Sequence, residues 1–253
     1  MVVTAQPACA TRVVSLDGCA DQYALGLLPG EDIAALSDRA ALDESYYRDR
    51  AKSFRRLRPQ VESVLALRPD VVLRTWGGDA KLIAALQRNH ITVININDVN
   101  TYPQAKDELM RVGHLLGADG QAQAEARAME ASLDGIDHIG VGKSVRYYTP
   151  SGYSAGPDTS VGYMLQTLGF TLESSEKGFF YLPPEVLLGE TPDVFALGYY
   201  DDRYQSVRAP GRNALMRRRI AERPHLTLPS QMITCFAWYT AYDLEALSRK
   251  GLN

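Results

Sequence analysis

The 253-residue sequence lacks long hydrophobic runs, and this absence limits what the chain can be. No stretch approaches the roughly 18–20 consecutive apolar residues that cross a bilayer as a helix. No apolar signal-peptide core precedes the first predicted strand either. The chain begins MVVTAQPACATRVVSL, a short lead-in of small residues that is typical of a mature exported protein whose signal peptide has been removed. We therefore expect an exported chain that does not span a membrane.

The sequence also lacks a strong charge of either sign. Its 27 Lys and Arg residues against 30 Asp and Glu residues give a net charge of −3, which is too weak a field to indicate nucleic acid as a partner. Lysine is scarce, with 6 residues against 21 arginines. Arginine forms paired N–H contacts with carboxylates and other planar anions. A GC-rich genome gives the same bias, so the arginines alone do not establish an anionic ligand.

Histidine and the common catalytic motifs are nearly absent. The four histidines fall on predicted helix ends or linkers, none where a strand ends: His90, His114, His138 and His225. A site for bare zinc or manganese needs several converging His and carboxylate ligands, so we predict no metal site. The chain has no nucleophile elbow, no Gly-rich dinucleotide motif and no phosphate loop, since GVGK at 140–143 lacks the required flanks. We predict no catalytic residue.

Cysteine is rare as well. The three cysteines, Cys9, Cys19 and Cys235, are an odd number, and their spacing fits no zinc motif. One disulfide with one spare thiol is expected in an oxidising compartment. Three buried thiols in the cytosol would give the same sequence pattern, so the choice stays open at this point.

What the sequence does contain is a regular alternation of short apolar strands and helical segments. This alternation predicts an α/β fold with parallel sheets. The predicted strands cover 12–16, 33–37, 70–76, 91–97, 144–150 and 193–200. The predicted helices cover 19–29, 59–69, 79–89, 159–170, 182–192, 211–224 and about 238–250.

The segment 101–136 separates two such halves and has no strand signal. Pro103 suits a helix start, and apolar residues from Leu109 to Leu133 keep helical spacing. Gly117 and Gly120 indicate a break or bend in the middle. A helix of about 30 residues would be ~45 Å long, so we expect a rigid bridge. The predicted organisation is an N-terminal α/β lobe (1–102), a bridging helix (103–134) and a C-terminal α/β lobe (135–253).

The two halves share a weak internal duplication. PEVLLGETPDVFALGYY mirrors VESVLALRPDVVLRTW, since both run from a helix through Pro-Asp and an apolar strand to an aromatic residue. The sequence therefore predicts aromatic side chains where a central strand of each half ends.

Several segments follow one another in an order that a known family shares. They are RVVSLDGCADQYALGLLPGEDIAALS, VESVLALRPDVVL, WGGDAKLIAALQRNHITVININ, YYTPSGYSAGPDTSVGYMLQTLGF, LPPEVLLGETPDVFALG and ITCFAWYTAYDLEALSR. In this order they resemble the cobalamin- and iron-siderophore-type periplasmic binding proteins of ABC importers. The resemblance covers nearly the whole chain, although no single motif is decisive.

The resemblance implies a fold and a function. The fold would be two α/β lobes with parallel central sheets, joined by one long helix, with the ligand in the cleft between them. The function would be capture of a metal chelate in the periplasm by a monomer that hands it to ABC permease subunits. A ferric siderophore is the leading ligand, and cobalamin, another corrinoid or haem are alternatives. The chelate is cargo, so no cofactor is implied. An α/β enzyme outside transport is the competing class.

Trp76 is the first candidate for ligand contact. It follows a predicted buried strand and precedes Gly77 and Gly78, which would let the backbone turn sharply and aim the indole at the cleft. Cobalamin binders of the family carry a similar Trp before a glycine pair. The competing interpretation is that Trp76 packs as a cap on the core.

The other candidates follow from position beside the expected cleft. The predicted ligand contacts are Trp76, Asp17, Arg58, Tyr153, Tyr199, Tyr200, Trp238 and Tyr239. By the family's use of acidic tips, the permease-docking candidates are Asp79, Asp201 and Asp202, although Lys81 stands near where a Glu would be expected. Cys19 and Cys235 both lie at junctions that this fold gathers around the cleft. A disulfide between them is one hypothesis, and separate thiols or a bond to Cys9 are the others.

Overall fold

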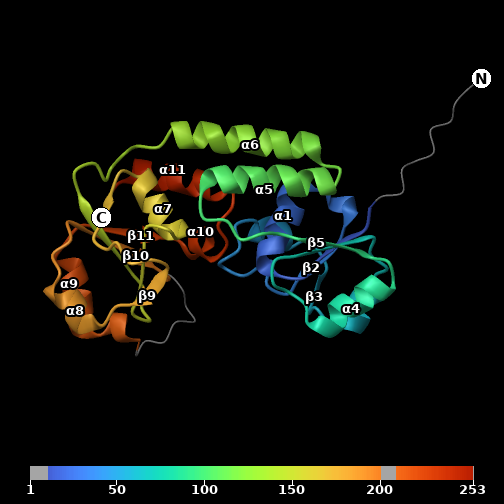
Figure 1. Cartoon of the computed structure of the whole chain (residues 1–253), viewed down its shortest axis with the longest axis horizontal. Helices are drawn as coiled ribbons and strands as arrows, with labels where there is room; N and C mark the ends of the chain where they lie inside the picture. The colour runs from blue at the N-terminus through green and yellow to red at the C-terminus, as the bar shows by residue number, and fades with distance from the viewer. Residues whose placement is uncertain (1–10, 201–208, 253) are drawn as a thin grey trace, which may run out of the picture. The chain divides into compact units, whose positions relative to one another are not determined.

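A computed structural model of the chain describes residues 11–200 and 209–252 (Figure 1). The chain divides into two compact units: a first unit of Met1–Asn97 and Arg111–Ala122, and a second unit of Asp98–Met110 and Gln123–Asn253. Each unit has its own parallel sheet, which confirms the predicted α/β class. Among the described residues, no helix combines the length and the apolar character that a membrane crossing requires.

The first unit is built on a five-stranded sheet of order β3-β2-β1-β4-β5, in which every neighbouring pair is parallel. The strands are β1 (Val13–Ser15), β2 (Ile33–Ser37), β3 (Arg56–Leu57), β4 (Val71–Arg74) and β5 (Thr92–Asn95). The chain adds β2 and β3 on one side of β1 and then β4 and β5 on the other. The order therefore reverses between β1 and β4. In open parallel sheets, ligands bind at such a reversal, beyond the carboxyl ends of the strands.

Two helices of the first unit, α1 (Gly18–Leu27) and α4 (Ala80–Arg88), begin at an aspartate cap. The others are α2 (Arg48–Ala51) and α3 (Val61–Leu65), with a 3-10 turn at Gly30–Asp32. Asp17 caps α1 and Asp79 caps α4, each through a carboxylate that accepts a backbone N–H three residues on. The apolar face of α4 packs on the sheet, where Leu82 and Leu86 join Val72 in one buried cluster.

The bridging segment forms two helices, α5 (Tyr102–Leu115) and α6 (Asp119–Asp134), so the prediction of one long helix is wrong. The reason is Gly117, whose φ of 68° is left-handed and ends α5. Figure 1 shows α5 and α6 side by side, and their contacts run in opposite directions along the chain. Lys106 pairs with Glu130 at 2.5 Å, whereas Gly113 lies against Ala122. The two helices are therefore antiparallel.

Both helices contribute to both units, because the division falls within each of them. In the first unit, Arg111 donates from its guanidinium to the Asn95 carbonyl at 2.6 Å. The Gln121 amide donates to the carbonyl of Gly26, in α1, at 3.4 Å. The end of α5 and the start of α6 are thus bonded to elements of the first unit.

The second unit is built on a four-stranded sheet of order β11-β10-β6-β8, again parallel throughout. The unit also contains a separate antiparallel pair of strands, β7 and β9. The strands are β6 (Ser144–Tyr148), β7 (Tyr153–Ala155), β8 (Thr171–Leu172), β9 (Phe179–Tyr181), β10 (Val194–Gly198) and β11 (His225–Leu228). The strand order reverses between β6 and β10, which makes this the counterpart of the reversal between β1 and β4.

The helices of the second unit pack an apolar core against β10. They are α7 (Ser160–Thr167), α8 (Pro184–Gly189), α9 (Ala214–Ala221), α10 (Ser230–Thr234) and α11 (Thr240–Lys250), with a 3-10 turn at Pro210–Arg212. Leu187 of α8 and Met216 of α9 pack on Phe195 and Leu197 of β10, and all four are buried. This burial explains why the apolar run of β10 was recognisable in the sequence.

The internal duplication is visible as an equivalent hydrogen bond in each unit. Asp70, just before β4, accepts the backbone N–H of Arg12 at 2.8 Å. Asp193, just before β10, accepts the backbone N–H of Ser144 at 2.8 Å. Each bond ties the start of the second central strand to the start of the first. The Pro-Asp step shared by the two halves therefore has the same structural role in both.

Candidate functional site

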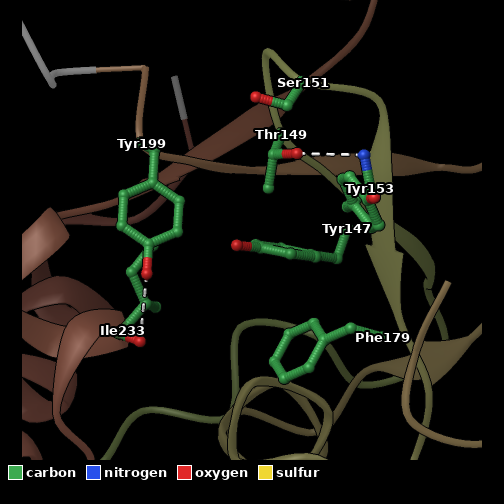
Figure 2. A pocket seen from close by; sticks show the side chains of 7 residues that line it. All are labelled: Tyr147, Thr149, Ser151, Tyr153, Phe179, Tyr199 and Ile233. Carbon is green, nitrogen blue, oxygen red and sulfur yellow. Dashed lines mark hydrogen bonds between the residues drawn. The ribbon is translucent and has the colours of Figure 1, made fainter. Parts of the chain in front are cut away.

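A pocket of about 400 Å³ opens in the second unit at the carboxyl ends of β6 and β10, where the strand order reverses. Figure 2 shows the Tyr147 side chain extending toward Tyr199, with Phe179 on one side and Thr149 and Ser151 on the other. The lining residues are Tyr147, Thr149, Ser151, Tyr153, Phe179, Tyr199 and Ile233. The volume lies in the range of small-molecule sites.

The turn after β6 places Tyr153 at the pocket. The Tyr153 backbone N–H donates to the Thr149 hydroxyl at 3.0 Å, and the Thr149 backbone N–H donates to the Tyr153 carbonyl at 2.9 Å. Tyr153 then pairs with Tyr181 of β9, and their rings meet edge to face at 5.9 Å between centroids. The result is an aromatic wall formed by the antiparallel pair β7 and β9, with Phe179 on the same strand as Tyr181.

Tyr199 forms the opposite wall with an unusual backbone. Its φ of 60° is left-handed, which costs a non-glycine residue of order 1 kcal/mol or more and is found most often at functional sites. Its hydroxyl donates to the carbonyl of Ile233, in α10, at 3.3 Å (Figure 2). The bond thereby joins the end of β10 to the last turn of α10 at the rim.

The described lining of the pocket is mainly aromatic. Four of the seven lining residues carry rings, Thr149 and Ser151 add hydroxyls, and none of the seven has a charged side chain. Burial raises the pKa of Tyr147 well above its usual value, and the nearby Tyr199 raises it further. The Tyr147 hydroxyl thus stays protonated and can donate a hydrogen bond. Such a pocket can hold a ligand with broad apolar faces and a few polar groups, and it contains no acid–base pair for catalysis.

The corresponding edge of the first unit presents Trp76, which is 60% exposed. The interpretation of Trp76 as a cap on the core is therefore wrong. Asp17 is buried, and its Oδ2 accepts the backbone N–H groups of Thr75 at 2.8 Å, Trp76 at 3.2 Å and Gly77 at 2.8 Å. A Cβ on Gly77 would lie 2.6 Å from the Leu16 carbonyl oxygen. The glycine is required because the turn passes this close to the end of β1.

The order of elements and the site at the strand reversal match a known family. The family model for periplasmic binding proteins matches residues 13–195, which is most of the chain. The chain belongs to the periplasmic binding protein family. This is a family of binding proteins and not of enzymes, and what its members carry are ligands and not cofactors.

This binding protein is similar to known proteins in sequence and in structure. A cobalamin-binding protein of Halobacterium salinarum is 24% identical over 202 residues, which are 76% of this chain and 51% of that protein. The chain thus spans about half the length of the curated relative it matches. The structure of a possible iron-binding periplasmic protein of Staphylococcus epidermidis superposes with a TM-score of 0.72 at 18% identity. It covers 94% of this chain and 97% of that one.

A second solved structure is similar to this binding protein to the same degree. The periplasmic heme-binding protein RhuT of Roseiflexus sp. RS-1 has a TM-score of 0.71 at 19% identity, with coverage of 95% and 97%. At these identities the structural similarity shows the fold alone.

Three predicted contacts of the binding protein, Tyr200, Trp238 and Tyr239, are not among the residues that line this pocket. Tyr200 donates from its hydroxyl to the Gly211 carbonyl at 3.0 Å and packs against the core cluster of β10. Trp238 is fully buried, and its indole N–H donates to Glu125 at 2.9 Å. Tyr239 is buried and donates to the Cys235 carbonyl at 2.7 Å. These bonds and contacts give the three aromatic residues a role in the packing of the second unit, and ligand contact by them stays a prediction.

Two charged candidates in the first unit also have other roles. The Arg58 side chain is 79% exposed and pairs with Asp38 at 3.4 Å, as expected of a solvated surface loop. Asp17 uses both carboxylate oxygens inside the protein, since its Oδ1 accepts from Ala20 at 2.9 Å. Asp17 is also buried, so the structure does not present it to a ligand, and direct contact by Asp17 stays a prediction.

The structure describes one of the three docking candidates and both cysteines of the predicted disulfide. Asp79 caps α4, and Asp201 and Asp202 lie outside the described residues. Cys19 and Cys235 are both disulfide-bonded. Because the chain has three cysteines, the one pairing that leaves both of these bonded joins them to each other.

Five pocket residues were not predicted: Tyr147, Thr149, Ser151, Phe179 and Ile233. Tyr147 was hidden within an apolar strand, where it has the pattern of a core residue. Phe179 and Ile233 belong to elements too short to give a periodic signal, β9 and α10. The signal that could have found Phe179 is the run Phe179–Tyr181, three consecutive aromatics after a polar stretch. Within the described ranges, no group of three or more His, Cys, Asp or Glu side chains could hold a metal ion.

Asp21 gives the first unit a predictable dependence on pH. Its buried carboxylate accepts from the Ser37 hydroxyl at 2.6 Å and the Ser37 N–H at 2.9 Å, but desolvation dominates and raises its pKa to about 6. Since the folded pKa exceeds the unfolded value, stability from this group is greatest at low pH and is lost as pH rises through 6. Relative to Asp21→Asn, the wild-type free energy of unfolding should fall by ~2–3 kcal/mol between pH 4 and pH 7.

Urea unfolding of both proteins at the two pH values measures this effect, because every other titrating group cancels in the difference. A wild-type minus variant difference that is the same at pH 4 and pH 7 would contradict it.

Proposed function

We propose that this binding protein captures a bulky metal chelate in the periplasm and delivers it to the permease of an ABC importer. The observation that carries the proposal is the mainly aromatic pocket at the strand reversal of the second unit. Its rings can lie against the apolar faces of a chelate, and its hydroxyls can bond to peripheral polar groups. Delivery to a permease rests on the family resemblance.

The charge of the pocket bears on which chelate is bound. The sequence alone favoured a ferric siderophore, with a corrinoid as the alternative. A tricatecholate siderophore carries several negative charges, and burying them beside the seven described lining residues, none of which is a cation, would be costly. We therefore propose a chelate without net negative charge, with a corrinoid such as cobalamin first and a ferric hydroxamate siderophore next. The cobalamin-binding relative from Halobacterium salinarum supports this order.

Haem is a second candidate ligand, because the Tyr147 hydroxyl could bind its iron. The Tyr147 hydroxyl lies in the pocket and makes no hydrogen bond within the described part of the chain. Tyrosine is a known ligand of haem iron, and Tyr153, also in the pocket, is the other residue placed for it. The solved structure of a heme-binding relative with this fold adds support. Against haem, its propionates would need cations, and none of the seven described lining residues carries one.

The decisive experiment is a binding panel with cyanocobalamin, a ferric trihydroxamate, a ferric tricatecholate and haemin. Binding of the first two at micromolar concentration, with weak binding of the tricatecholate, is the expected result. Tight tricatecholate binding would refute the charge argument. If none of the four binds, the proposed function is wrong.

Trp76 is proposed to provide the ligand contact of the first unit. Because its side chain is 60% exposed, Trp76→Ala should cost little free energy of unfolding. It should weaken binding by ~1–3 kcal/mol, the size typical of an aromatic anchor. Calorimetry with the ligand identified by the panel measures the loss. Leu215→Ala, which removes an equally exposed apolar side chain in the second unit, is the control and should leave affinity unchanged. A large loss of stability with unchanged affinity would contradict the assignment.

Docking to the permease stays a prediction for Asp79, Asp201 and Asp202. Of these, Asp79 accepts the Leu82 N–H at 2.8 Å through one carboxylate oxygen. Its second oxygen is available for an arginine of a permease, so capping and docking are compatible in one side chain.

A further inference from the structure

The orientation of Trp76 is not fixed by bonds of its own side chain. The indole N–H makes no hydrogen bond within the described residues, and the single bond recorded for Trp76 is the one from its backbone N–H to Asp17. Its side chain is largely in solvent. The direction of the ring therefore depends on the backbone of the turn that carries it.

That backbone is fixed by one carboxylate. Asp17 Oδ2 accepts three consecutive backbone N–H groups, from Thr75 to Gly77, at distances between 2.8 and 3.2 Å. Hydrogen bonds to an ionised acceptor are about twice as strong as neutral ones. Asp17 itself is fixed, because it is buried at the end of β1 and its Oδ1 caps α1. The bonds to the turn join the ends of β1 and β4 at the strand reversal.

We infer that Asp17 is the positioning residue that holds Trp76 outward for ligand contact. The effect of Asp17 on ligand binding rests on the proposed function. The effect of Asp17 on the orientation of Trp76 does not depend on that function. The Asp17 carboxylate already binds the backbone of the turn. We therefore expect Asp17 to affect ligand binding through the orientation of Trp76 and not by direct contact with the ligand. Asp17, which the sequence predicted to be a ligand contact, would then be the residue that positions the ligand contact Trp76.

Asp17→Asn separates this role from helix capping. Asparagine is as good a helix cap as aspartate, so its single side-chain oxygen can keep the bond to Ala20. Its amide cannot accept the three N–H groups of the turn, since an NH₂ group only donates. Gly77→Ala tests the same contact from the other side, because the added Cβ would lie 2.8 Å from Asp17 Oδ2 and 2.6 Å from the Leu16 carbonyl oxygen. If one variant fails to fold, the other still gives the measurement.

The matched control is Asp70→Asn. Asp70 also accepts a backbone N–H through its carboxylate, at 2.8 Å, but at the amino end of β4. Asp70→Asn loses one exposed backbone bond and should lower stability less than Asp17→Asn, without affecting Trp76.

Tryptophan fluorescence provides a readout that a purely structural role would not change. The chain has two tryptophans, and Trp238 is fully buried, so iodide quenching reports on Trp76. Asp17→Asn and Gly77→Ala should change the quenching constant and emission maximum of the folded protein, and Asp70→Asn should change neither. Unchanged Trp76 fluorescence in both of the first two variants would overturn the inference, whether or not any chelate binds.

A double-mutant cycle with the panel ligand tests the effect on binding. Asp17→Asn should weaken binding about 5- to 100-fold in the wild type and less than about twofold in the Trp76→Ala background. Equal losses in the two backgrounds would show that Asp17 does not act through Trp76. If no chelate binds the wild type, the proposed function fails, and the fluorescence result alone decides the positioning role.

Discussion

Replacing Cys19 and Cys235 together by serine is expected to lower the free energy of unfolding by about 4–5 kcal/mol. The two residues are disulfide-bonded, and the bond closes a loop of more than two hundred residues. A cross-link over a loop of this length removes many conformations of the unfolded chain, which is the main source of its stabilisation in the chain-entropy model. Urea unfolding of the oxidised wild type and the double variant measures the difference.

Cys9→Ser is the matched control, because it removes a thiol and leaves the bond between the other two cysteines. It should not change stability. Thiol titration of the denatured, unreduced protein should find one free thiol in the wild type and none in Cys9→Ser. Three free thiols in the wild type would contradict the disulfide.

Glu190→Ala is expected to cost about 3–5 kcal/mol of unfolding free energy. Arg146 lies on the central strand β6 with its side chain only 6% exposed. Its guanidinium donates from two nitrogens to the two oxygens of Glu190, each at 2.6 Å. Removing the carboxylate leaves a buried cation without its partner, and this desolvation cost is much larger than the net gain from forming the pair.

Glu222→Ala provides the comparison within the same unit. Glu222 also pairs with an arginine, Arg218, at 2.9 Å, but on a helix surface where the arginine side chain is 80% exposed. Such pairs contribute less than about 1 kcal/mol. Denaturant unfolding should therefore rank Glu190→Ala far below Glu222→Ala in stability. Equal values for the two variants would show that burial of Arg146 does not matter.

The parts of the fold that were predictable are those whose local pattern and packing agree. The predicted strand at 33–37 is β2, and β4 and β10 lie within the predicted strands because both are buried, apolar and preceded by Pro-Asp. The reversal of the chain at Gly117 was not predictable to the same degree. Helical spacing continues on both sides of the glycine, and only the left-handed backbone distinguishes a turn from a bend.

Two of the predicted contacts lie just beyond a central strand: Tyr199 follows β10 and lines the pocket, and Trp76 lies exposed two residues after β4. Exposure could not be predicted from the sequence. Trp76 and Trp238 both stand beside predicted elements, yet one is exposed and the other is fully buried against Glu125. The positioning role proposed for Asp17 could not be predicted from the sequence. The three backbone N–H groups that its Oδ2 accepts belong to residues nearly sixty positions away in the chain.

The shared helices have a consequence for how the protein is made. Part of the first unit, Arg111–Ala122, is encoded after a stretch that belongs to the second. A chain emerging from a ribosome or a translocation channel, amino end first, cannot complete the first unit until Ala122 is free. Until then the Gly26 carbonyl lacks the Gln121 amide that bonds to it in the folded protein. A fragment cut at residue 102 would keep that defect permanently, so a separately expressed first lobe needs α5 and α6 attached.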